Sequence, residues 1–325
     1  MSLAIKDDEI NIVLGAVHPD LKEELKIPEG FNLDVYKKPD IDRVVGSSTS
    51  VLFSGYACRY FGYLVSRKKY IISMDDDCLP ARDPKGADFV RGYPFSLRSG
   101  VKCALSCGLW LNLADHDAPT QALKAKQKNS RYVDAVMTRV SNRGRGRVFG
   151  YFGFTVIAAV AGAIAAVADA IAAVAAGSLV SISGINIAFD REVVGPALVP
   201  ALKLGGEGKF RWETMEDIWS GLCIKVVCDH LGLGVKTGLP YMWRTDRGDP
   251  IASLKKEWEG VKLMEELVPF FQSVRLPREA TTVKDCVVEV ANAAKERLGS
   301  TDPVFARAAK AMLNWVNLWK SVGSI

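Results

Sequence analysis

Short runs of apolar residues recur through the first 250 residues, and each has the length and β-branched content of a buried strand. The runs are residues 10–16, 31–36, 70–74, 108–112, 185–190 and 232–243. Two segments between them, 54–67 and 211–229, place apolar residues at helical spacing. Strands that alternate with helices predict an α/β fold. The connection at 17–27 is short for a crossover between parallel strands.

The last quarter of the chain has a different pattern. Segments 251–272, 282–298 and 303–321 show the amphipathic spacing of helices. Trp315 and Trp319 lie one turn apart, so they predict either a core face or an oligomer face. We therefore expect an α/β domain at 1–250 and a helical region at 251–325 packed on it.

Residues 139–177 form an atypical segment inside the first domain. A run rich in arginine and glycine at 139–147 precedes an uncharged stretch at 148–168, and Ala-rich sequence resumes after Asp169. The uncharged stretch is long enough to span a membrane. Alanine and glycine drive insertion weakly, and Asp169 would lie inside a longer span, so a membrane span is disfavoured. A buried Ala-rich helix and an insertion foreign to the fold are the alternatives.

Composition excludes several functional classes. The chain has 325 residues, of which 49% are hydrophobic, and a formal charge of +5, which indicates a folded globular protein and argues against nucleic-acid binding. Seven cysteines and an N-terminus without a secretory signal indicate reduced thiols in a cytosol-facing protein. Cys103 and Cys107 have the spacing of a ligand pair, but the three scattered histidines offer no second pair, so zinc is disfavoured.

The stretch at 70–78 carries the strongest chemical signal, because a short apolar strand ends in Asp75, Asp76 and Asp77. Ligands bind at the carboxyl ends of strands in open α/β sheets, and paired carboxylates there can hold a hard divalent cation together with a nucleotide diphosphate. Asp75 and Asp77 share one side of an extended chain, and Asp76 faces the other. The alternative is a solvated acidic turn.

Three further groups are candidates for the same chemistry. Arg91 and Arg98 offer planar donors suited to phosphate, although both could also be surface residues packed on aromatic neighbours. One histidine lies between two acids at 115–117, a pattern that is most often a solvated loop. Asp217 lies in the first turn of a predicted helix, where a carboxylate is favoured by the helix dipole and could also point into a pocket.

Several blocks of the sequence closely resemble the reversibly glycosylated polypeptides, the UDP-arabinopyranose mutases of plants and green algae. The blocks are residues 54–78, 86–100, 108–121, 129–138, 184–192 and 228–243. The resemblance implies a GT-A-like nucleotide-sugar-binding mixed sheet flanked by helices, with a helical C-terminal portion. It also implies interconversion of UDP-arabinopyranose and UDP-arabinofuranose for cell-wall polysaccharide synthesis, with reversible self-glycosylation on arginine.

The resemblance further implies roles for individual residues. Asp75 and Asp77 would hold Mn²⁺ or Mg²⁺, and Asp76 and Arg59 would join them in binding the UDP-sugar. Arg91 matches the family's glycosylated arginine, and Arg98 matches a second functionally important arginine. We take Asp217 as a candidate acid or base.

The family's known associations give expectations for partners and location. We expect UDP-arabinose and other UDP-sugars as substrates, and homo- or hetero-oligomers with family members. We expect location in the cytosol and on the cytosolic face of the Golgi, with peripheral membrane association and no nucleic acid.

The chain departs from the family pattern in three large ways. It lacks segments after the first strand and between the acidic run and the block at 86–100, and it carries the insertion within 139–177. Relatives commonly have histidine where this chain has Cys107 and Arg244, and the second of these could complete a metal site. These departures leave two alternatives to the mutase: a catalytically impaired partner subunit of a mutase oligomer, or a UDP-sugar glycosyltransferase with an external acceptor.

Overall fold

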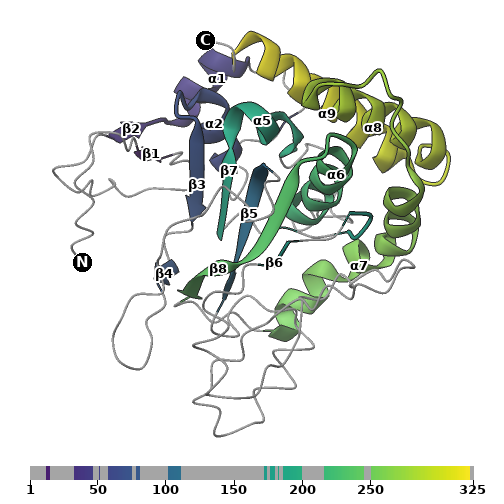
Figure 1. Cartoon of the computed structure of the whole chain (residues 1–325), viewed down its shortest axis with the longest axis horizontal. Coiled ribbons are helices and arrows are strands. Elements are labelled where there is room, and N and C mark those ends of the chain that lie inside the picture. Colours follow the sequence, from purple (N-terminus) through teal and green to yellow (C-terminus); the bar gives the residue numbers. More distant parts are fainter. Residues whose placement is uncertain are drawn as a thin grey trace, which may run out of the picture.

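A six-stranded mixed sheet forms the centre of the protein, with helices packed beside it (Figure 1). The computed structural model describes residues 12–14, 33–46, 51, 58–74, 78–80, 102–110, 172–173, 176–179, 182, 186–199, 216–244 and 250–322. The main strands are β3 (Tyr70–Met74), β4 (Cys78–Pro80), β5 (Cys103–Trp110), β7 (Asn186–Asp190) and β8 (Gly234–Arg244). They pair in the order β3-β7-β5-β8-β4, and the short β6 (Ala172–Ala173) pairs with β8.

The strand directions give the sheet one edge at which three carboxyl ends meet. β3 and β5 are both antiparallel to β7, and β5 is parallel to β8. β3, β5 and β8 therefore run the same way, and we call the edge at which they end the carboxyl edge. β1 (Ile12–Leu14) and β2 (Leu33–Val35) form a separate parallel pair.

Eight helical segments belong to the described residues. They are α1 (Lys38–Val45), α2 (Cys58–Val65), α5 (Arg191–Val194), the 3₁₀ turn η2 (Gly195–Ala197), α6 (Glu216–His230), α7 (Pro250–Ser273), α8 (Val283–Leu298) and α9 (Pro303–Ser321). α8 contacts both α6 and α9, and α6 contacts β8, so the C-terminal helices join the sheet through α6 (Figure 1). The α/β sheet and the helical C-terminal portion predicted from the sequence are confirmed.

The C-terminal helices begin where their sequences offer caps. Thr282 Oγ1 accepts a hydrogen bond from Asp285 N at 3.2 Å, and Asp302 Oδ1 accepts one from Val304 N at 2.7 Å. Each cap satisfies a backbone donor that the helix leaves without a partner. Trp315 and Trp319 are 0% and 2% exposed and meet edge to face, with ring centroids 5.8 Å apart. Of the two predictions for this tryptophan pair, the core face is therefore correct.

Several elements differ from the prediction, and the short elements β4, β6, α5 and η2 were not predicted. β5 begins at Cys103, five residues before the predicted strand, because its small residues Ala104 and Ser106 are buried in the sheet interior. α1 was not predicted, because five of its eight residues are charged or proline, although Ile41, Val44 and Val45 have the i, i+3, i+4 spacing of a helix.

No helix of the part of the chain that the structure describes combines the length and the apolar character needed to cross a bilayer. The uncharged stretch at 148–168, on which the membrane-span alternative rested, lies outside the described residues.

Candidate functional site

The acidic run joins the two edge strands of the sheet at its carboxyl edge. Residues 75–77 are outside the described residues, but β3 ends directly before them and β4 begins directly after them. In the register, Met74 pairs with Asn186, and Cys78 pairs with Arg244, the last residue of β8. The run is therefore bounded on one side by the start of β7 and on the other by the end of β8.

The length of the connection limits how far apart these strand ends can be. Four residues of extended chain reach at most about 14 Å, so Met74 and Cys78 lie within that distance. β3 and β4 are at opposite ends of the strand order, and β8 extends past β5 to meet β4, beyond the end of β3 (Figure 1). The described residues on either side of the acidic run, Met74 and Cys78, therefore both lie at the carboxyl edge.

Two helices also begin at this edge. α2 leads into β3 through a short turn, so it runs antiparallel to the strand, and its first turn, with Arg59, lies towards the carboxyl edge. α6 leads into β8 through a turn that includes Gly232, whose φ of 67° favours glycine. The first turn of α6, with Asp217, therefore also lies towards the carboxyl edge.

The structure describes the elements that carry two of the predicted site residues and leaves the other site residues unplaced. Arg59 and the backbone of Asp217 lie on helices that begin at the edge where the acidic run is attached. The acid-histidine-acid cluster at 115–117 comes after β5 in the sequence and is outside the described residues. Arg91 and Arg98 are also outside them, so their roles stay predictions.

Cys103 and Cys107 lie in the buried interior of β5. Burial raises the pKa of the Cys107 thiol to about 12 and also raises the pKa of Cys103. Thiols with such pKa values stay protonated at neutral pH, and a protonated thiol is a poor metal ligand. Among the described residues, no group of three histidine, cysteine or carboxylate side chains is arranged to hold a metal ion.

Arg191 is a buried charged residue that sequence reasoning missed. Its Nε donates to the carbonyl of Tyr63 at 2.9 Å and its Nη2 to the carbonyl of Leu64 at 2.7 Å, so it satisfies two carbonyls in the last turn of α2. Its guanidinium also lies over the ring of Trp319, 4.8 Å from the centroid. Arg191 therefore fixes α2 to α9, and no local sequence pattern indicates contacts over 128 residues.

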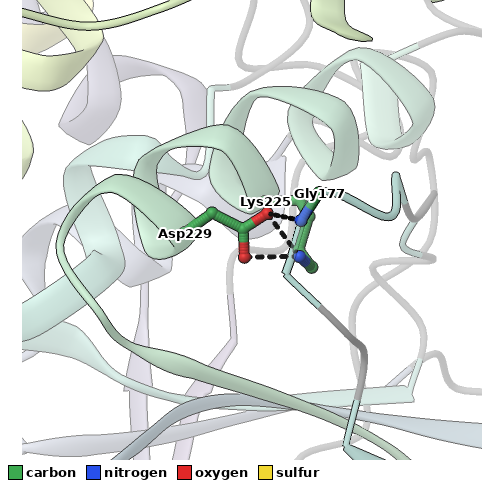
Figure 2. A network of polar contacts seen from close by, with 3 residues as sticks. All are labelled: Gly177, Lys225 and Asp229. Atoms are coloured by element: carbon green, nitrogen blue, oxygen red, sulfur yellow. Dashed lines mark hydrogen bonds and ion pairs between the residues drawn. The ribbon is translucent and has the colours of Figure 1, made fainter. Parts of the chain in front are cut away.

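Sequence reasoning also missed a second network, which fixes the end of the atypical segment. Lys225 Nζ lies 2.5 and 2.6 Å from the two carboxylate oxygens of Asp229, one turn further along α6 (Figure 2). Asp229 Oδ2 also accepts a hydrogen bond from Gly177 N at 2.9 Å. The i, i+4 spacing of lysine and aspartate was a usable signal for the first contact. The contact with Gly177 attaches the end of the atypical segment to α6.

Comparison with known proteins gives a match along nearly the whole chain. The family described as reversibly glycosylated polypeptide matches residues 5–87, 84–145 and 151–324. The breaks in this match fall at the predicted missing segment before the block at 86–100 and within the atypical segment.

Individual relatives agree with the family match. A protein of Arabidopsis thaliana named "Probable UDP-arabinopyranose mutase 5" is 52% identical, with coverage of 100% of this chain and 99% of the relative. A protein of Oryza sativa subsp. japonica named "Probable inactive UDP-arabinopyranose mutase 2" is 45% identical, with the same coverage. "UDP-arabinopyranose mutase 1" of Arabidopsis thaliana is 41% identical over 92% of this chain and 83% of the relative.

The alignment with the first relative extends over 381 positions, against the 325 residues of this chain, so the relative has segments that this chain lacks. Identity of this degree over the full length nevertheless leaves the relationship plain. The chain belongs to the reversibly glycosylated polypeptide family.

Proposed function

We propose that this protein interconverts UDP-arabinopyranose and UDP-arabinofuranose, using a GT-A-like domain. The observation that carries the proposal is the position of the acidic run, between β3 and β4 and opposite the end of β8, in a chain 52% identical to a relative named as a probable mutase. The carboxyl edge of an α/β sheet is where nucleotide ligands bind, which supports the same assignment.

In this proposal the acidic run holds the diphosphate end of the substrate. Asp75 and Asp77 are hard oxygen donors suited to Mn²⁺ or Mg²⁺, and Asp76 and Arg59 contact the nucleotide sugar. A divalent cation bound there supplies positive charge to the diphosphate oxygens. Arg98 adds a planar fork of donors to the phosphates and fixes their orientation.

The sugar is transferred to the protein and back. The bond between the anomeric carbon and UDP breaks, UDP leaves with the electron pair, and a guanidinium nitrogen of Arg91 bonds to the anomeric carbon. That nitrogen loses its proton to Asp217, which returns it when UDP recaptures the sugar. While the sugar is held by the protein, the bond between the anomeric carbon and O5 breaks and a bond between the anomeric carbon and O4 forms. The proton of the O4 hydroxyl passes to O5, so no other reactant is needed.

The proposal includes location and assembly. The substrate is a cytosolic UDP-sugar destined for cell-wall polysaccharide, so we place the protein in the cytosol and at the cytosolic face of the Golgi. We expect it to assemble with itself or with family members.

A second candidate function is a catalytically impaired subunit of a mutase oligomer. It is favoured by the rice relative, whose name describes it as probably inactive, and by the segments that this chain lacks relative to the first Arabidopsis protein. Such a subunit would keep the sheet and the helical region without completing the UDP pocket.

The two candidates are separated by turnover of purified protein with UDP-arabinopyranose and Mn²⁺. Formation of UDP-arabinofuranose, abolished in the double variant Asp75→Asn and Asp77→Asn, supports the mutase. A control pair, Glu265→Gln and Glu266→Gln, removes two exposed carboxylates of α7 and should leave turnover unchanged. No product from the wild-type chain alone, together with increased turnover by a co-purified active relative, supports the subunit.

A further inference from the structure

One side-chain hydrogen bond links the helix and the strand that lead to the acidic run. Tyr63 Oη, from the last turn of α2, donates to Ser73 Oγ, near the end of β3, at 2.6 Å. Both residues are buried, with 4% and 7% of their surfaces exposed. A short hydrogen bond shielded from water is a stronger constraint than the same bond at the surface.

The tyrosine that makes this bond is held on several sides. Its ring meets Tyr60 and Phe189 edge to face, with centroids 5.2 and 5.0 Å away. Its backbone carbonyl accepts the 2.9 Å hydrogen bond from Arg191. A ring packed this closely has one rotamer, so the position of its hydroxyl relative to β3 is fixed.

The serine lies in a strand at the edge of the sheet. β3 is an edge strand, and within the described part of the chain it pairs with β7 alone. Ser73 is two positions before Asp75 in the sequence and one position before the last residue of β3. The hydrogen bond therefore fixes the end of β3 to α2 just before the acidic run begins.

The same helix carries another candidate site residue. Arg59 lies in the first turn of α2, one turn before Tyr63. The hydrogen bond fixes the position of α2 along the direction of β3. It therefore also fixes the distance between the first turn of α2 and the residues that follow β3. Arg59 and the acidic run are both assigned to the nucleotide, so the distance between them decides how well both can bind one ligand.

We propose that Tyr63 and Ser73 are positioning residues for the UDP and divalent-cation site, acting through the placement of the acidic run relative to α2. This inference rests on the proposed function, because it assumes that Asp75 and Asp77 bind the cation. Removing a group that orients a metal ligand, but does not itself bind the metal, typically changes metal affinity by 10- to 100-fold.

The test is the affinity for UDP measured by titration calorimetry, with Mn²⁺ and with EDTA, on the full chain. We expect Tyr63→Phe and Ser73→Ala each to weaken Mn²⁺-dependent UDP binding by about 10-fold. The double variant should lose no more than either single one, because both remove the same bond. Binding in EDTA should change by less than twofold, a selectivity that a general loss of folding would not produce.

Two further variants complete the design. Ser73→Thr keeps the hydroxyl on a residue that suits a strand, and it should bind within twofold of wild type. Ser273→Ala removes a hydroxyl that accepts a hydrogen bond from Arg297 between α7 and α8, and it should have no effect on UDP affinity. Thermal melting of each variant identifies any that are unfolded, and Ser73→Ala is the smaller change should Tyr63→Phe fail to fold.

The outcomes separate this inference from the proposed function. If wild-type protein binds UDP in an Mn²⁺-dependent way but both folded variants bind within twofold of it, the positioning role is wrong and the site assignment stands. Equal losses with Mn²⁺ and with EDTA would also overturn the positioning role. If wild-type protein shows no Mn²⁺-dependent binding, the site assignment fails and the inference fails with it.

Discussion

Replacing Arg191 with methionine tests how the described core is held together. Methionine keeps an unbranched apolar side chain but offers no donor to the carbonyls of Tyr63 and Leu64. Each buried carbonyl left without a donor costs about 1–3 kcal/mol, and the lost contact with the Trp319 ring adds about 1 kcal/mol. The guanidinium no longer has to be buried, which offsets part of this cost. We expect the free energy of unfolding to fall by about 3 kcal/mol.

The assay is urea unfolding followed by circular dichroism, and Arg307→Met provides the matched control. Arg307 is an exposed residue of α9, and methionine has a similar helix propensity, so this variant should stay within about 0.5 kcal/mol of wild type. The slope of the transition should be the same in all three proteins, because the surface exposed on unfolding is unchanged. A loss at Arg191 below about 1 kcal/mol would refute the reasoning, since it would mean that the two carbonyls find other donors.

Three further predictions concern packing, charge and pH. Gly195→Ala places a Cβ against the indole of Trp319 and should lower stability by about 1–3 kcal/mol in thermal melts, a cost that at least halves in a Trp319→Leu background. In urea unfolding, Asp229→Asn should cost about 2 kcal/mol and more than Lys225→Met, because it removes the carboxylate that accepts two hydrogen bonds from a buried ammonium. The reverse order would contradict this account. Burial raises the pKa of the Cys223 thiol from 9.0 to about 12, so above pH 9 the unfolded thiol ionises while the folded one does not, and stability falls as pH rises. Between pH 9 and 10.5, Cys223→Ala should lose about 2 kcal/mol less than wild type, and equal losses would exclude this cause.

Much of the sheet follows from local pattern. The apolar runs that predicted strands at 185–190 and 232–243 correspond to β7 and β8 within two residues at each end. Their residues are apolar because the strands lie in the middle of the sheet, where both faces are covered. The start of β5 and the whole of α1 were missed, although Leu105 and the helical spacing of Ile41, Val44 and Val45 were usable signals.

The candidate site shows where sequence reasoning stops. The acidic run could be placed at the end of a strand, because the apolar run and the carboxylates are adjacent in sequence. The position of Arg59 and Asp217 relative to that edge depends on the direction of α2 and α6 relative to the strands that follow them. Strand order and direction are set by contacts between distant segments, which a local pattern does not record. The bond between Tyr63 and Ser73 depends on the same packing.

The central claim is that this chain alone interconverts the two forms of UDP-arabinose. The most direct measurement is a proton NMR time course of the purified protein with Mn²⁺, started from UDP-arabinopyranose in one sample and from UDP-arabinofuranose in another. An enzyme cannot change an equilibrium, so we predict that both samples reach the same ratio of pyranose to furanose. If folded protein leaves both starting sugars unchanged, the claim that this chain is a mutase is contradicted.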